Sequence, residues 1–103
     1  IKERYKETVR KRILVVMGYN VYMLKSLGKR PITYVGYTNN LKKRISLHNL
    51  GKGAKFTRGR KWKIIYVEKM KSKKEAISRE YYIKNNRNLR NKIKNEYFNS
   101  TTL

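Results

Sequence analysis

The sequence has no cysteine, no aspartate, one proline and a single histidine. Without cysteine the chain forms no disulfide, no cysteine-ligated zinc site, no iron–sulfur cluster and no thiol nucleophile. One histidine also excludes a multi-histidine metal site. No stretch approaches the roughly 18 consecutive apolar residues that a membrane span requires. The sequence therefore excludes a transmembrane protein, disulfide scaffolds and most metalloprotein classes.

Acidic groups are few, and basic groups dominate the chain. Lys and Arg number 28 against six glutamates, which gives a formal net charge of +22 at pH 7. Such a domain repels itself unless a polyanion screens the charge. We expect nucleic acid as the partner, with DNA ahead of RNA. A membrane surface is less favoured, because the basic residues form no long amphipathic helix. Binding should then fall steeply with salt, in an intracellular compartment that the sequence does not identify. Carboxylate chemistry is limited to Glu3, Glu7, Glu68, Glu75, Glu80 and Glu96.

The length of 103 residues, with 39% hydrophobic residues and nine tyrosines, predicts one small folded domain and not a disordered basic tail. Residues 1–17 form a basic lead-in of undetermined role that does not begin with Met. The candidate domain covers residues 18–98, followed by a tail at 99–103. No internal repeat or linker indicates a second domain.

The order of the expected elements is β-β-α-β-α-α, an α/β (α+β) sandwich. Residues 19–27 and 32–38 read as a hairpin around the turn at 28–31, which would place Tyr22 opposite or diagonal to Tyr34. Asn39 or Asn40 can cap a helix that ends near Gly51 and Gly53.

The second half of the chain carries a third strand and two further helices. Residues 62–68 read as the strand. Ser72 and Glu75 form an S-x-x-E capping box before a helix through about Asn85. Asn88 can cap a last helix, whose stripe of Leu89, Ile93 and Tyr97 would face the core.

The first helix places Arg44 and His48 beside the apolar positions Leu41 and Ile45. A cationic pair at the edge of an apolar stripe suits a cleft in which Arg44 holds a phosphate and His48 orients a water. The alternative is a solvated basic face.

Glu80 lies beside the core-facing stripe of the second helix. A single carboxylate can anchor one Mg²⁺ or Mn²⁺ ion, which takes its other ligands from water and substrate phosphate. The alternative is an exposed i,i+4 ion pair with Lys84.

Tyr22 and Tyr34 on neighbouring strands have two interpretations. Surrounding cations would favour the phenolate and make either residue a general base, whereas the default for a strand tyrosine is a core position. Between the first helix and the third strand, residues 51–60 read as a flexible loop that contacts the phosphate backbone, or else as a disordered basic linker. The expected nucleic-acid contacts are Lys43, Lys52, Lys55, Phe56, Arg58, Arg60 and Lys84.

Taken together, these motifs resemble the GIY-YIG nuclease family, in particular its small stand-alone bacterial members and the nuclease module of Slx-type structure-specific endonucleases. The resemblance covers residues 20–95. It rests on Val21-Tyr22-Met23, Tyr34-Val35-Gly36-Tyr37-Thr38, Leu41-x-x-Arg44-x-x-x-His48-Asn49, the segment 51–60 and Glu75-Ala76-x-x-x-Glu80-x-x-Ile83-Lys84. Asn20 and Val21 replace the Gly and Ile of the first motif, and Val35 replaces the Ile of the second.

The resemblance implies a three-stranded antiparallel sheet flanked by helices and phosphodiester hydrolysis with one divalent ion. Glu80 would bind the metal and Arg44 would stabilise the phosphate. Tyr22 and Tyr34 match the paired motif tyrosines, and His48 matches a frequent active-site histidine. An active-site asparagine is also common in the family; its counterpart is open among Asn85, Asn86, Asn88, Asn91 and Asn95.

We therefore expect a metal-dependent endonuclease acting on DNA, with branched, nicked or flapped structures as candidate substrates. Two alternatives remain open. One is a non-catalytic RNA- or DNA-binding protein, such as a ribosomal or other nucleoprotein component that retains the nuclease fold. The other is the catalytic fragment of a longer enzyme.

Overall fold

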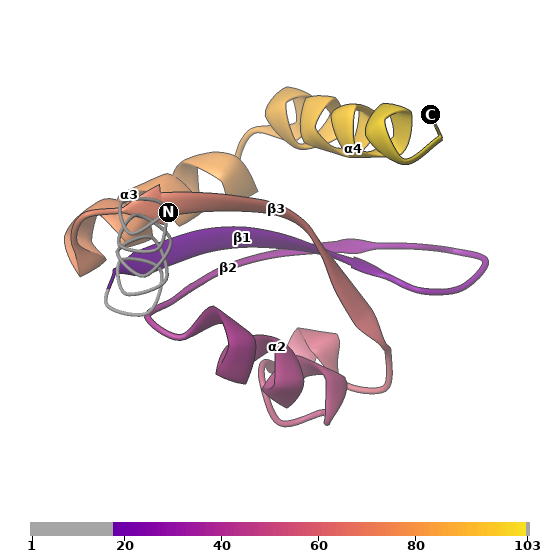
Figure 1. Cartoon of the computed structure of the whole chain (residues 1–103), viewed down its shortest axis with the longest axis horizontal. Helices are drawn as coiled ribbons and strands as arrows, with labels where there is room; N and C mark the ends of the chain where they lie inside the picture. Colours follow the sequence, from indigo (N-terminus) through magenta and orange to yellow (C-terminus); the bar gives the residue numbers. More distant parts are fainter. Residues whose placement is uncertain (1–17, 103) are drawn as a thin grey trace, which may run out of the picture.

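The structure is a computed structural model that describes residues 18–102 (Figure 1). The lead-in 1–17 lies outside these residues. Three antiparallel strands form one sheet in the order β2-β1-β3. They are β1 (Tyr19–Ser26), β2 (Thr33–Thr38) and β3 (Trp62–Met70), joined by α2 (Leu41–Asn49), η1 (Lys55–Thr57), α3 (Lys73–Lys84) and α4 (Arg87–Thr102). The predicted fold class and element order are confirmed.

Both faces of the central strand β1 are buried, because successive side chains of a strand point to opposite faces. Val21 and Met23 pack with Ala76 and Ile83 of α3 and with Ile93 of α4. Tyr22 and Leu24 pack on the other face with Trp62, Leu41 and Ile45. The sheet thus lies between α2 on one side and α3 with α4 on the other (Figure 1).

The hairpin register places the two motif tyrosines on the same face. Tyr22 lies opposite Gly36, and Leu24 lies opposite Tyr34. The tyrosines are therefore diagonal neighbours, with ring centroids 6.3 Å apart.

A register shift between Met23 and Leu24 interrupts the pairing of β1 with β3. Met23 pairs with Tyr66 and Leu24 with Ile64, so Ile65 is the extra residue of a bulge. Ile65 and Tyr66 consequently both pack on the α3 and α4 face, while Ile64 packs on the face that α2 covers.

Side-chain caps define where the first two helices begin. The Asn40 side chain accepts a hydrogen bond from the Lys43 backbone N–H at 3.1 Å and starts α2. The Ser72 hydroxyl accepts from the Glu75 N–H at 3.1 Å and starts α3, as predicted. Glu75 differs from a reciprocal capping box, because its carboxylate accepts from the Lys71 N–H. Gly51, just past the end of α2, has a φ of +75°, a conformation that favours glycine.

The last helix begins differently from the sequence prediction. Asn86, and not Asn88, accepts a hydrogen bond from the Leu89 N–H at 3.0 Å, so the expectation for Asn88 was wrong. The helix also continues to Thr102, past residue 98. Within the described part of the chain, no helix is long and apolar enough to cross a membrane.

Candidate active site

A chain of buried hydrogen bonds links the central strand to α2 and η1. The Tyr22 hydroxyl lies 2.7 Å from His48 Nε2. His48 Nδ1 lies 2.8 Å from the Thr57 hydroxyl oxygen, and that hydroxyl in turn donates to the Ala54 carbonyl at 2.9 Å. Tyr22, His48 and Thr57 have no exposed surface. Three elements therefore meet at one polar chain inside an otherwise apolar layer.

The direction of these hydrogen bonds assigns the histidine tautomer. A carbonyl oxygen only accepts, so the Thr57 hydroxyl hydrogen points at Ala54. Thr57 Oγ1 then accepts from the His48 Nδ1–H, which leaves Nε2 without a proton. The Tyr22 hydroxyl consequently donates to Nε2. His48 stands as a proton acceptor for Tyr22.

Burial keeps both groups neutral. It raises the pKa of the Tyr22 hydroxyl to about 12, although the nearby Arg44 cation acts in the opposite direction. The pKa of His48 is lowered, first by burial and then by the positive charge of Arg44. Desolvation therefore outweighs the attraction to Arg44, and the pKa of Tyr22 shifts opposite to the direction expected from the surrounding cations.

Aromatic rings cover the Tyr22–His48 pair. The Tyr34 ring lies 5.0 Å from the His48 ring, centroid to centroid, and Phe56 stacks on Tyr34 at 6.1 Å with an interplanar angle of 23°. Phe56 is 58% exposed. Tyr34 is half-buried and is the more accessible of the two motif tyrosines.

Arg44 reaches the same place from α2. The pKa of the Arg44 guanidinium is raised, first by a hydrogen bond with the Tyr22 hydroxyl and further by the Tyr34 hydroxyl. Partial burial of Arg44 acts in the opposite direction. Its Nε atom is buried and has no hydrogen-bond partner. An unpaired buried N–H is costly, and a guanidinium that keeps one is suited to an anion. Arg44 is therefore not part of a merely solvated basic face.

Glu80 lies on α3, which packs on the face of the sheet opposite to α2. Its Oε1 forms a 2.8 Å ion pair with Lys84, and its side chain is 17% exposed. The Lys84 ammonium also lies 5.8 Å from the centroid of the Tyr34 ring. The negative charge of Glu80 raises the pKa of Tyr22, so the carboxylate lies within electrostatic reach of the buried pair. The i,i+4 ion pair considered as an alternative does form, and it forms beside the candidate site.

The donor set limits the kind of metal ion that fits. No group of three or more His, Cys, Asp or Glu side chains gathers among residues 18–102. A fully protein-coordinated ion therefore does not fit the described residues. A hydrated Mg²⁺ or Mn²⁺ held by the Glu80 carboxylate and completed by substrate phosphate does fit.

Two glycines make room for the buried pair. A Cβ on Gly36 would lie 2.5 Å from the Tyr22 hydroxyl oxygen, and one on Gly53 would lie 2.5 Å from His48 Nδ1. No L side chain is accommodated at either position without moving Tyr22 or His48. The third residue of the second motif, Gly36, is thus a glycine because the Tyr22 side chain lies against its backbone.

The segment 51–60 is tied down where a flexible loop was expected. It contains η1, and the Trp62 indole N–H donates to the Thr57 carbonyl at 2.9 Å. Asn49 and Trp62, which flank the segment, are also bonded to each other. The Asn49 side chain accepts from the Trp62 N–H at 2.6 Å and donates to the Trp62 carbonyl at 3.2 Å. Asn49 ends the sequence motif that begins at Leu41, but neither its bonds to Trp62 nor the bond of Thr57 to His48 was predicted from the sequence. The Thr57 spacing to Ala54, which matches an N-cap and its N3 position, was the available signal.

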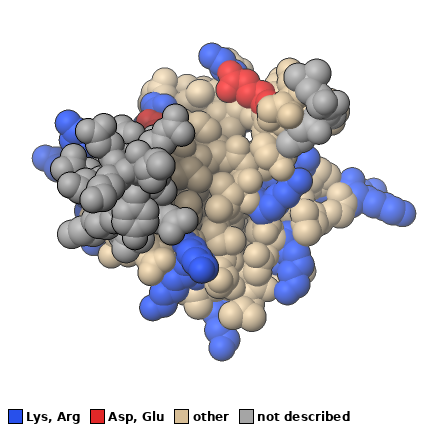
Figure 2. All heavy atoms as spheres, in the orientation of Figure 1, with Lys and Arg blue, Asp and Glu red and all other residues tan. Residues whose placement is uncertain are grey.

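The other predicted residues surround the site at varying distances. Lys84 and Phe56 contact Tyr34. Arg60 instead donates to the Arg30 carbonyl at 3.2 Å, in the loop that joins β1 to β2. Exposed cations that extend over α2 and the following segment are Lys43, Lys52, Lys55 and Arg58. Figure 2 shows Lys and Arg side chains spread around the visible face, with few acidic atoms between them.

Four of the five candidate asparagines divide into two groups, and the fifth, Asn88, lies in the first turn of α4. Asn85 donates to the Tyr81 carbonyl at 2.8 Å, and Asn86 caps α4, so both serve the backbone. Asn91 and Asn95 lie on α4 and line a groove beside the hairpin.

Comparison with known proteins agrees with this arrangement. The GIY-YIG catalytic domain matches residues 18–94. A UPF0213 protein of Clostridium perfringens is 57% identical over 69 residues, which cover 66% of this chain and 71% of that protein. A UPF0213 protein of Oceanobacillus iheyensis is 54% identical over 52 residues, covering 50% and 60%, respectively. The UPF0213 protein YazA of Bacillus subtilis is 50% identical over 52 residues, covering 50% and 52%.

The match thus spans just over half the length of some relatives. No solved structure matches the chain. The family match covers the whole sheet, the Tyr22–His48 pair, Arg44 and Glu80. The chain belongs to the GIY-YIG family, whose domain is a nuclease domain.

Proposed function

We propose that the protein is a metal-dependent endonuclease that hydrolyses phosphodiester bonds in DNA inside the cell. The observation that supports this most directly is the buried, unpartnered Nε of Arg44 beside the Tyr22–His48 hydrogen bond. One face of the sheet thereby carries an anion-binding cation next to a proton donor and acceptor pair. The family match to a nuclease domain points to the same chemistry.

Arg44 would bind a non-bridging oxygen of the scissile phosphate and neutralise the negative charge that develops there. Lys84, on the other side of Tyr34, is a second cation within reach of the same phosphate. A divalent ion held by Glu80 would supply further charge neutralisation. Lys84 must then share or release the Glu80 carboxylate, because the ammonium occupies Oε1.

Tyr22 and His48 would move the proton of the attacking water as a pair. With a pKa of about 12, Tyr22 is almost entirely protonated at neutral pH and cannot act as a free phenolate base. As the water oxygen bonds to phosphorus and the P–O bond to the leaving strand breaks, the water proton passes to the Tyr22 oxygen and the Tyr22 proton passes to His48 Nε2. The leaving oxygen takes its proton from solvent. Tyr22 has no exposed surface, so this step requires the Tyr34 ring to shift when substrate binds.

Cleavage of linear, nicked, flapped and four-way DNA in Mg²⁺ or in EDTA tests the proposal. Glu80→Gln and Arg44→Ala should each lower the rate by about a hundredfold or more, while DNA binding stays close to that of the parent. Glu96→Gln and Lys42→Ala are matched controls, since Glu96 is an exposed acid on α4 and Lys42 is an exposed cation on the helix that carries Arg44.

Equal cleavage by the parent and by Glu80→Gln would contradict the proposal. Tight binding without any metal-dependent product would favour the second candidate, a non-catalytic nucleic-acid-binding protein. The net charge of +22 is the observation that favours that candidate. Binding of structured RNA more tightly than branched DNA at equal salt would distinguish it further.

A further inference from the structure

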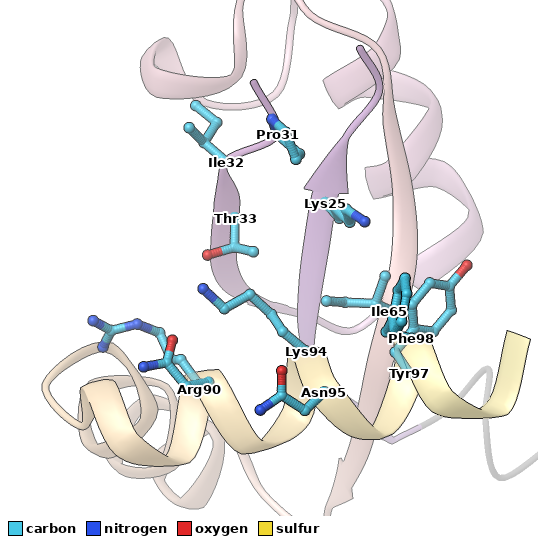
Figure 3. A pocket seen from close by; sticks show the side chains of 11 residues that line it. Lys25, Pro31, Ile32, Thr33, Ile65, Arg90, Lys94, Asn95, Tyr97 and Phe98 are labelled. Atoms are coloured by element: carbon cyan, nitrogen blue, oxygen red, sulfur yellow. The ribbon is translucent and has the colours of Figure 1, made fainter. Parts of the chain in front are cut away.

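A second hollow lies on the α4 side of the sheet. It has a volume of about 890 Å³ and runs between α4 and the hairpin strands (Figure 3). In Figure 3, Lys94 and Asn95 project from α4 toward the strands, and Thr33 and Lys25 lie across from them. We call this hollow the α4 groove.

The polar lining of the α4 groove is basic and neutral, without an acidic side chain. Its cations are Lys25, Arg90 and Lys94. The single acid in the α4 sequence, Glu96, is not among the lining residues. Asn91, Lys94, Asn95 and Phe98 follow an i, i+3, i+4, i+7 spacing, so one stripe of α4 carries two amides, a cation and an aromatic ring toward the groove. This lining complements a polyanion that also offers hydrogen-bonding groups.

The α4 groove is continuous with the candidate active site. A smaller pocket of about 340 Å³ is lined by Tyr34, Phe56 and Lys84, and it shares Thr33 and Arg90 with the α4 groove. The Arg90 guanidinium donates to the carbonyls of Ile83 and Lys84, which fixes α4 to the end of α3 at this junction. A chain bound at Tyr34 would therefore meet the α4 groove directly.

Exposed aromatic rings stand along this path. Phe56 is 58% exposed beside Tyr34, and Phe98 is 60% exposed in the α4 groove. A ring can stack on a base only when that base is unpaired, and grooves that combine cations with such rings bind single strands. A paired duplex keeps its base faces stacked inside the helix and offers no base face to an exposed ring.

We propose that the α4 groove binds a single-stranded DNA segment that is continuous with the strand held at the candidate active site. This inference rests on the proposed nuclease function and specifies its substrate as DNA with an unpaired flank. Lys25, Arg90 and Lys94 would contact phosphates, and Phe98 would stack on a base.

Fluorescence anisotropy in EDTA, where no metal-dependent cleavage occurs, tests this inference. The two probes are a fluorescein-labelled duplex of about 20 base pairs and the same duplex with a tail of about ten thymidines. The parent protein should bind the tailed probe at least about fivefold more tightly, the lower end of what one stacked base contributes. One tailed probe carries the tail at a 3′ end and another carries it at a 5′ end. A gain in affinity from either tail supports the inference.

Two variants locate the gain in the α4 groove. Phe98→Leu, which keeps an apolar side chain, should remove most of the tail-dependent gain and leave duplex binding unchanged. Lys94→Gln should lower the salt slope of tailed binding by about 0.7, the value for one phosphate contact on a single strand. Lys92→Gln is the control, because it removes the same charge from an exposed position of α4 that does not line the groove. Thermal unfolding by circular dichroism checks that each variant is folded.

Equal affinity of the parent for tailed and blunt probes would overturn the inference. An equal effect of Lys94→Gln and Lys92→Gln, or an undiminished tail gain in folded Phe98→Leu, would overturn it as well. Cleavage plays no part in these measurements. If the protein cuts DNA but binds tailed and blunt probes equally, only the inference about the α4 groove is refuted. If it binds tailed probes more tightly but does not cut DNA, only the proposed nuclease function is refuted.

Discussion

At the scale of single residues, the proton between Tyr22 and His48 is the feature that decides the chemistry. Because the chain has one histidine, its ring nitrogens can be observed without assignment ambiguity. We expect nitrogen NMR at pH 7 to show a neutral imidazole with its proton on Nδ1, donated to Thr57. The pKa from a titration should lie below 6.5. A proton on Nε2 would contradict the proposed direction of the Tyr22 hydrogen bond.

Arg44→Gln gives the matched comparison for that titration. The positive charge of Arg44 is the second cause of the lowered pKa of His48, after burial. Its removal should move the pKa upward without restoring the ordinary value, because burial remains. Lys42→Gln, an exposed change on the same helix, should leave the pKa where it is.

The same lowered pKa makes folding stability depend on pH with a definite sign. The unfolded chain binds a proton on His48 below about pH 6.5, whereas the folded protein resists it. The unfolded state then holds more protons, so the free energy of unfolding decreases as the pH falls from about 6.5 toward the folded pKa. Urea unfolding at several pH values above about 5, where most carboxylates are still ionised, measures this slope.

His48→Gln is the control for the pH dependence. It should be less stable than the parent at pH 7, because it disrupts the bonds to Tyr22 and Thr57, yet its stability should be nearly flat over the same interval. A parent that becomes more stable on acidification would contradict the buried neutral histidine.

At the scale of elements, the beginning of α3 supports Glu80 and Lys84. The Ser72 hydroxyl accepts from the Glu75 N–H, and replacing such an N-cap by alanine costs about 1 kcal/mol. We expect Ser72→Ala to lower the free energy of unfolding by that amount in urea titrations. Ser78→Ala, the same change at an exposed interior position of α3, should be neutral or slightly stabilising. Equal losses from the two variants would show that Ser72 does not act as a cap.

The elements themselves were predictable because their signals are local. Asn40, Gly51 and Ser72 mark helix ends by their own side chains or backbone, and β1 carries a continuous apolar run at 21–24 because both of its faces are buried. The beginning of α4 was misplaced because Asn86 and Asn88 are the same residue type two positions apart. Only the geometry of the chain leaving α3 selects Asn86.

The candidate site was less predictable than the fold. The sequence motifs indicated Arg44, Glu80 and both tyrosines, and the structure brings these side chains within electrostatic reach of one another. The sequence also showed many cations near Tyr22, but it could not show that desolvation outweighs them. Thr57 stands at the N3 position relative to Ala54, but that spacing does not indicate the bond to His48, which depends on the chain folding back onto α2.

At the scale of the whole molecule, the net charge of +22 acts on the fold and on the partner in opposite senses. The described residues contain two ion pairs, Arg79–Glu68 and Lys84–Glu80. Most basic side chains of this region therefore repel one another across the surface. A compact state that concentrates this charge is less stable than its packed core alone would make it.

Salt should consequently stabilise the free protein and weaken its complex with DNA. Between about 0.01 M and 0.1 M NaCl the Debye length falls from about 30 Å to about 10 Å, which screens repulsion between distant cations. We expect the melting temperature of the free protein to rise over this interval. Duplex DNA should raise the melting temperature most at the lowest salt, because its affinity is greatest there and binding stabilises the folded state. A free protein whose melting temperature is constant or falls with NaCl would show that repulsion between its cations does not limit the stability of the fold.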